Sequence, residues 1–161
     1  MALKDSGKRR KFDSGAVRDI AGGKGRCDLL PLVTIGEMNE DLILQEIGKY
    51  VYDGAKRHIE NALRMFIKMR YLTCHDAMLE VSKHYEDGAI KYQPRNWEKG
   101  IPHHCYVDSG VRHYFKYMRG DTDEPHDRAF IWNMLGLLWN HDNKPELNDL
   151  PFREVAQNES L

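Results

Sequence analysis

Apolar residues recur along most of this chain with the spacing of amphipathic helices. The first predicted helix follows Asn39, and its inward positions are Leu44, Ile47 and Val51. A second helix is predicted after a break at Gly54, with inward positions Ile59, Leu63 and Phe66. No segment alternates convincingly between apolar and polar residues with period two, so the predicted class is all-α.

Three further helices are predicted. One begins at Thr73, because Thr73-x-x-Asp76 forms a capping box, and its inward face is Met78, Val81, Tyr85 and Ala89. The next covers residues 107–118 and stops at Gly120, with Val107, Val111, Phe115 and Met118 turned inward. The last begins at the acidic turn 120–127 and runs to about Asn140.

The remaining segments lack this periodicity. Residues 1–28 are rich in Gly and basic residues and poor in large apolar ones, which predicts a flexible arm, or a loop that orders on a partner or ligand. Prolines and a glycine predict a loop over 92–105 and an irregular tail over 146–161, which leaves 29–145 as the helical domain. The run at 22–25 is no nucleotide-binding P-loop, since Arg18 stands where the upstream glycine is required.

Charge and cysteine content narrow the class of protein. The chain has 24 Lys and Arg against 25 Asp and Glu, so no overall field favours nucleic acid. Three widely spaced cysteines indicate reduced thiols rather than a disulfide framework. No apolar run is long enough to span a membrane, and we expect a cytoplasmic protein.

The acidic turn carries the clearest candidate chemistry. Four carboxylates fall within seven positions, at Asp121, Asp123, Glu124 and Asp127. A helix N-terminus favours one or two acidic residues, but four repel one another unless a cation lies among them. Mg²⁺ or Mn²⁺ with oxygen ligands would relieve that repulsion, and a solvated acidic loop is the alternative. Helical spacing places His126 and Asn133 on the face of Asp123 and Asp127, and Asn133 interrupts an apolar run, so its amide should be buried and bonded.

The preceding helix and loop offer complementary groups. Asp108 and Arg112 stand at i and i+4, as either a surface ion pair or a metal ligand beside a phosphate contact. Two antiparallel helices would place Asp108 far from the acidic turn, unless a second subunit restored the contact. In the loop, Lys91 and Arg95 could hold phosphates while Trp97 stacks on a base or simply anchors the packing.

As a set, these motifs resemble phage and prophage dATP/dGTP diphosphohydrolases, which are relatives of the MazG-like all-α NTP pyrophosphatases. The matching stretches are GKGRCDLLP at 23–31, GAIKY at 88–92, RNWEKG at 95–100, Asp108-Ser109 with Arg112-His113, and GDTDEPH at 120–126 with Trp132-Asn133. Residues 38–87 look like an insertion relative to shorter members. The resemblance implies a MazG-like helical bundle that is completed in a dimer or tetramer.

The activity implied is hydrolysis of a purine (deoxy)nucleoside triphosphate to the monophosphate and pyrophosphate with Mg²⁺ or Mn²⁺. The expected catalytic residues are Glu124 and Asp127. The expected metal ligands are Glu98, Asp108, Asp123, Glu124, His126 and Asp127. The expected substrate contacts are Lys24, Arg26, Lys91, Arg95, Asn96, Trp97, Arg112, His113 and Asn133.

One departure from the family pattern leaves an alternative open. Glu124-x-x-Asp127 matches the second acidic pair of MazG-like enzymes, but residues 107–118 offer only Asp108 in place of the first. The alternative function is therefore a protein that binds and sequesters a nucleotide without cleaving it.

Overall fold

The computed structural model describes residues 4–152, and helices dominate this part of the chain. Six α-helices run over Leu32–Met38 (α1), Leu42–Asp53 (α2), Arg57–Arg70 (α3), Cys74–Lys91 (α4), His103–Arg119 (α5) and His126–Asn143 (α6). Short 3₁₀ turns occupy Cys27–Leu29 (η1), Asn96–Lys99 (η2) and Pro145–Leu147 (η3). Arg9–Lys11 (β1) and Val17–Asp19 (β2) pair as a small antiparallel hairpin. The all-α class is confirmed.

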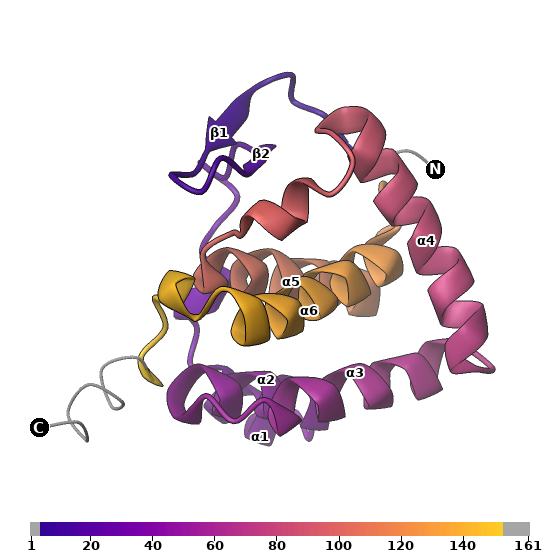
Figure 1. Cartoon of the computed structure of the whole chain (residues 1–161). Coiled ribbons are helices and arrows are strands. Elements are labelled where there is room, and N and C mark those ends of the chain that lie inside the picture. Colours follow the sequence, from indigo (N-terminus) through magenta and orange to yellow (C-terminus); the bar gives the residue numbers. More distant parts are fainter. Residues whose placement is uncertain (1–3, 153–161) are drawn as a thin grey trace, which may run out of the picture.

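The antiparallel pair of α5 and α6 forms the centre of the molecule (Figure 1). Helices α1, α2 and α3 lie below this pair, the hairpin and η2 lie above it, and α4 runs along one side. Two glycines let the central helices approach closely. A Cβ on Gly110 would lie 2.5 Å from Met134 Cε, and one on Gly136 would lie 2.4 Å from a ring carbon of Tyr106.

Helix ends follow the capping signals in the sequence. The Thr73 hydroxyl accepts a hydrogen bond from Asp76 N at 3.0 Å, which confirms the predicted start of α4. Gly54 and Gly120 adopt φ values of 67° and 90°, in the left-handed region, and they end α2 and α5.

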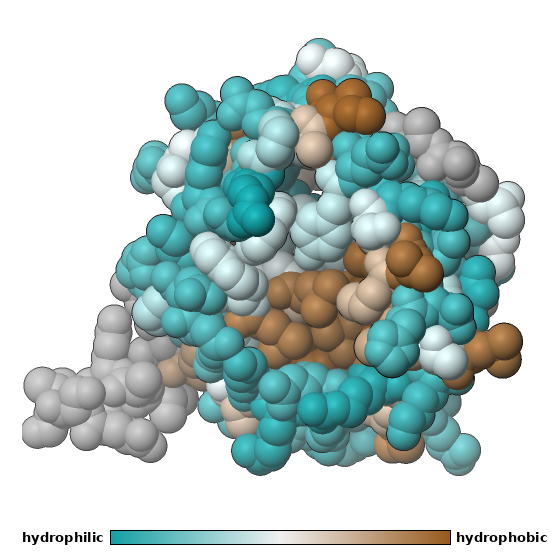
Figure 2. All heavy atoms as spheres, turned by 45° about the vertical axis from the view of Figure 1, so that its right-hand side comes forward, coloured by the Kyte–Doolittle hydropathy of each residue, from teal (hydrophilic) through white to brown (hydrophobic). Residues whose placement is uncertain are grey.

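The core lies between the central pair and α3. The fully buried ring of Phe66 is 4.6 Å from that of Phe130 and 5.3 Å from that of Tyr117, measured between centroids. Figure 2 shows apolar side chains gathered in the region between α6 and α3, with polar side chains around them. None of the helices in residues 4–152 combines the length and the apolar character needed to cross a membrane.

The described part of the N-terminal arm is folded, which differs from the flexible arm expected from composition. Asn96 on η2 holds β2 with two bonds, accepting from Val17 N at 2.9 Å and donating to Val17 O at 2.8 Å. Ala16, at the turn, is completely buried. The Asn96 side chain therefore makes the hydrogen bonds to β2 that a neighbouring strand would otherwise make. The amino-acid composition of the arm does not indicate this contact.

Other element boundaries also differ from the prediction. Helix α1 was not predicted, and α5 begins at His103, inside the predicted loop, because Pro102 is tolerated just before a first turn. The predicted inward face of α4 is confirmed in part: Val81 is buried, and Met78 and Tyr85 are partly buried against the core. The other fully buried residues, Ala77 and His84, were not predicted. In the tail, Asp149 accepts a bond from His104 N at 2.9 Å, and residues 153–161 lie outside the described part.

Candidate functional site

A cavity of about 730 Å³ opens between the hairpin, the C-terminal end of α4, and the central helices α5 and α6. Seven of the residues predicted from sequence line it together: Lys24, Lys91, Asn96, Arg112, His113, Glu124 and Asn133. They come from four separate segments of the chain. The fold therefore unites most of the expected substrate contacts in one place.

The cavity wall is strongly cationic. Its eight basic side chains are Lys4, Arg10, Arg18, Lys24, Lys91, Arg112, Lys116 and Arg119. Its three carboxylates are Asp5, Asp19 and Glu124. Since the chain as a whole is nearly neutral, this excess is local, and it makes the cavity attractive to a polyanion.

A cluster of carboxylates and imidazoles lies where α5 ends and α6 begins. Ligand atoms of His113, Glu124 and His126 lie within 4.8 Å of one another, and so do those of Asp121, Asp123 and His126. Carboxylate oxygens suit Mg²⁺ or Mn²⁺, and an imidazole nitrogen favours a transition metal. The donor set therefore fits a divalent cation such as Mn²⁺.

The two histidines of this cluster are joined in a hydrogen-bonded series. His126 Nε2 lies 2.7 Å from Asp123 Oδ1, and His126 Nδ1 lies 2.9 Å from His113 Nδ1. If His126 Nε2–H donates to the Asp123 carboxylate, His126 Nδ1 accepts a hydrogen bond from His113 Nδ1–H. The free lone pair of His113 is then on Nε2. Burial, together with the neighbouring His126, holds the pKa of His113 well below its ordinary value, so its ring is neutral.

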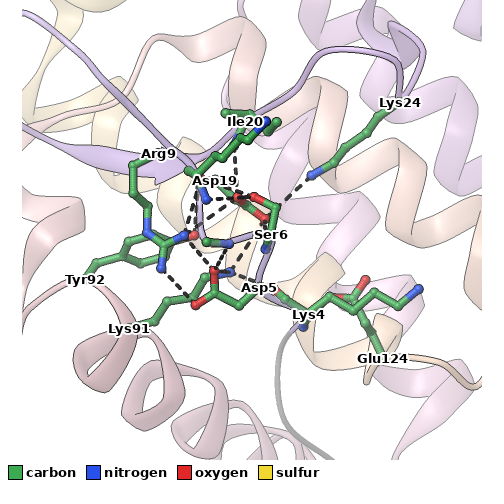
Figure 3. A network of polar contacts seen from close by, with 12 residues as sticks. Lys4, Asp5, Ser6, Arg9, Asp19, Ile20, Lys24, Lys91, Tyr92 and Glu124 are labelled. Carbon is green, nitrogen blue, oxygen red and sulfur yellow. Dashed lines mark hydrogen bonds and ion pairs between the residues drawn. The ribbon is translucent and has the colours of Figure 1, made fainter.

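The segment Lys4–Ser6 lines the cavity, and Figure 3 shows its side chains in a polar network with those of Asp19 and Lys91. Lys4 N donates to Glu124 Oε1 at 3.0 Å, the Lys4 ammonium pairs with Asp123, and Lys91 Nζ donates to Lys4 O at 2.6 Å. The Lys4 ammonium lowers the pKa of the Asp123 carboxyl, mainly through the hydrogen bond between them and to a smaller extent through its charge. Lys4 thus supplies a positive charge among the carboxylates of the acidic turn.

Asp108 and Arg112 anchor the glycine-rich segment on α5. Asp108 Oδ1 accepts from Cys27 N at 2.7 Å, while Oδ2 pairs with Arg112. Arg112 in turn donates to Lys24 O at 3.3 Å and to Gly25 O at 3.0 Å. Asp108 therefore fixes the loop that carries Lys24, and it lies outside the cluster at the acidic turn, as the antiparallel geometry predicted.

The inner end of the cavity is aromatic. The Arg18 guanidinium lies 5.4 Å from the ring centroid of Trp132 and 5.8 Å from that of Tyr106. It donates to Cys105 O at 3.3 Å and to Asn133 Oδ1 at 3.2 Å. The predicted burial and bonding of the Asn133 amide are confirmed, since its Nδ2 also donates to Ala129 O at 2.8 Å.

Several predicted site residues lie elsewhere. Asp127 accepts from Arg70 Nε at 2.9 Å and from Tyr71 Oη at 3.2 Å, in the contact of α6 with α3. The Trp97 ring packs edge-on against Trp139 at 5.1 Å between centroids, which is the anchoring role. The remaining three predicted residues are Arg95, Glu98 and Arg26. Arg95 and Glu98 form an ion pair with each other, while Arg26 pairs with Asp28 and lines a second cavity.

Sequence reasoning missed part of the cavity wall. Arg18 drew attention only as a residue that breaks a P-loop pattern, and Lys4 and His84 drew none. The signal that identifies them is contact with distant segments. That signal exists only after the hairpin has folded onto α5 and α6.

Comparison with known proteins identifies a family. The family model described as dATP/dGTP diphosphohydrolase, N-terminal, matches residues 60–150, which is more than half of the chain. The matched range contains α4, η2, α5 and α6 and includes residues 60–87, the later part of the segment expected to be an insertion. No curated protein and no solved structure matches the chain significantly.

Proposed function

We infer the function from a family assignment that this match establishes: the chain belongs to the dATP/dGTP diphosphohydrolase family. We propose that it hydrolyses a purine deoxynucleoside triphosphate to the monophosphate and pyrophosphate, with Mg²⁺ or Mn²⁺. Water attacks the α-phosphorus, the bond to the bridging oxygen breaks, and pyrophosphate leaves.

The observation that carries this proposal is the pairing of a cationic cavity with a cluster of candidate cation ligands, two of which, His113 and Glu124, line that cavity. A triphosphate needs positive charge along its length, which eight basic side chains offer. It also needs a divalent cation to neutralise charge as pyrophosphate leaves, and His113, Glu124 and His126 lie close enough together to hold one.

Individual residues take separate roles in this proposal. Lys24 and Lys91 hold phosphate oxygens, and their ammonium nitrogens lie near each other, at 3.9 and 3.8 Å from Asp19 Oδ2. A bound cation would polarise the phosphates and lower the pKa of a coordinated water. His113 and Glu124 would hold that cation, and Asp123 fixes the orientation of the His126 ring through its 2.7 Å bond.

A nucleotide-binding protein without catalysis is the second candidate. The observation that favours it is the position of Asp127, which Arg70 and Tyr71 engage outside the cavity. In this chain the Glu124-x-x-Asp127 pair thus offers one carboxylate, rather than two, to the cluster.

Release of pyrophosphate tests the two functions against each other. Purified protein is incubated with dGTP or dATP and Mn²⁺, and both products are quantified. The expected result is equal amounts of monophosphate and pyrophosphate, with the reaction stopped by EDTA and restored by excess Mn²⁺. Tight binding in calorimetry with no product over hours would favour the non-catalytic function, and neither binding nor turnover would reject both.

We also propose that the chain forms a homo-oligomer, a dimer or tetramer. The end of α3, the turn after it and the first half of α4 expose large apolar side chains that a partner would cover: Met69 at 49% exposed, Leu72 at 99% and Leu79 at 69%. We expect Leu72→Asp to lower the mass seen in sedimentation equilibrium, with Leu29→Asp on the opposite part of the chain as the matched control. An unchanged mass for Leu72→Asp would place the contact elsewhere.

A further inference from the structure

We propose that the inner end of the cavity binds the purine base, and that Arg18 selects guanine over adenine. This inference rests on the proposed function, because it assumes that the ligand of the cavity is a purine nucleotide. It goes further in naming the base and the residue that reads it.

The two ends of the cavity are separated along the central helices. Near the acidic turn, His113 of α5 lies against His126 of α6. Further along the same pair, Gly110 faces Asn133, whose Cβ would lie 3.2 Å from an added Cβ. Asn133 stands seven positions after His126 on α6, a distance of about 10 Å at the helical rise of 1.5 Å per residue. A ligand that has its phosphates near the acidic turn and extends along this helix pair therefore reaches Asn133 with its base.

Arg18 is held rigidly at this inner end but keeps free donors. Its contacts with Cys105 O and Asn133 Oδ1 use two of the five N–H groups of a guanidinium. No carboxylate in residues 4–152 forms an ion pair with it. Desolvation accordingly lowers the pKa of Arg18, and a ligand with acceptor atoms would compensate for the lost solvation.

His84 gives a second, independent sign of a ligand. It lines the cavity with only 7% of its surface exposed, and its Nδ1 has no hydrogen-bond partner among the described residues. Burial lowers the pKa of His84 to about 4, so the ring is neutral and offers one donor and one acceptor. Buried polar atoms without partners are rare in proteins, which points to a polar group of a ligand at this position.

The donors of Arg18 discriminate between the purines. Guanine presents two acceptors, O6 and N7, on the edge that an arginine fork fits. Adenine replaces O6 by an amino group, which would face the guanidinium as donor against donor. The Trp132 ring, which is 5.9 Å from the ring of His84, provides an aromatic surface in the same region.

Equilibrium binding tests the inference separately from catalysis. Calorimetry with dGTP, dITP and dATP, with EDTA present to prevent turnover, should give dGTP and dITP similar affinities. Both should bind roughly tenfold to a hundredfold more tightly than dATP, the discrimination expected of a bidentate arginine contact. Arg18→Met should bring the dGTP to dATP ratio close to one, and Lys24→Ala should weaken both nucleotides equally.

The outcomes are distinguishable. Equal affinities in the wild type, a preference for dATP, or an unchanged ratio in Arg18→Met would each overturn the inference. Circular dichroism verifies that Arg18→Met is folded. If it is not, His84→Phe replaces it, and the expected result is weaker dGTP binding with the phosphate contacts intact. A guanine preference in a protein that releases no pyrophosphate would reject the proposed reaction while supporting the base subsite.

Discussion

Glu124→Gln should reduce pyrophosphate release by at least about a hundredfold, since a bound cation contributes several kcal/mol of charge stabilisation and each 1.4 kcal/mol is a factor of ten. Glu124 lies at the cavity wall within reach of both His113 and His126. Glutamine keeps the size of the side chain but removes the charge that binds the cation. Initial rates with saturating Mn²⁺ measure the loss.

The fold should survive this substitution. Glu124 is only partly buried, and its Oε1 accepts a hydrogen bond from Lys4 N, which the amide oxygen of glutamine would still accept. The matched control is Glu60→Gln on α3, a carboxylate that pairs loosely with Arg64 at 4.0 Å and should leave the rate unchanged. Wild-type rates for Glu124→Gln would move the cation site away from the acidic turn.

Asp127→Asn gives an informative comparison with Glu124→Gln. The sequence pattern treats the two carboxylates as equivalent members of one pair. In the structure Asp127 bonds to Arg70 and Tyr71 instead of facing the cavity. A loss of rate as large as that of Glu124→Gln would mean that Asp127 joins the cluster once substrate is bound.

His126→Phe should lower the affinity for Mn²⁺ by about tenfold or more. Losing a residue that only orients a metal ligand already has an effect of that size. His126 is 2% exposed and belongs to both candidate ligand sets. Phenylalanine fills similar space but removes both ring nitrogens, so Asp123 and His113 lose their shared partner. Calorimetric titration with Mn²⁺ measures the change.

His141→Phe is the matched control, because it makes the same change on the same helix about 22 Å away at 1.5 Å per residue. His141 Nδ1 lies 2.8 Å from the hydroxyl of Tyr50, and this contact is remote from the acidic turn. Its Mn²⁺ affinity should equal that of the wild type. Equal affinities for both variants would show that no imidazole at the acidic turn binds the cation.

The helical part of the fold could be predicted from the sequence because its signals are local. Apolar spacing, the Thr73 cap and the left-handed glycines at 54 and 120 each act within one or two turns of a helix. The hairpin gave no such signal. Its strands are three residues long, and bonds to the Asn96 side chain hold it, so no alternation could develop.

The site residues divide in the same way, into those that a local sequence pattern indicates and those that depend on contacts between distant segments. Side-chain chemistry and helical spacing indicate Lys91, Arg112 and Asn133, and motifs that resemble a known family add His113. The cavity brings the four together. The repulsion in the acidic turn was recognised too, but Lys4, more than a hundred positions away in sequence, relieves part of it. Contacts of that separation depend on the tertiary fold, and no local pattern encodes them.

The position of Trp132 has a practical consequence. Its indole lies in the cavity wall under the Arg18 guanidinium, whereas the chain's other two tryptophans, Trp97 and Trp139, pack edge-on against each other. Stacking of a nucleobase against an indole quenches its emission. The intrinsic fluorescence of the unlabelled protein should therefore report occupancy of the inner cavity, with the Trp97–Trp139 pair as a constant background.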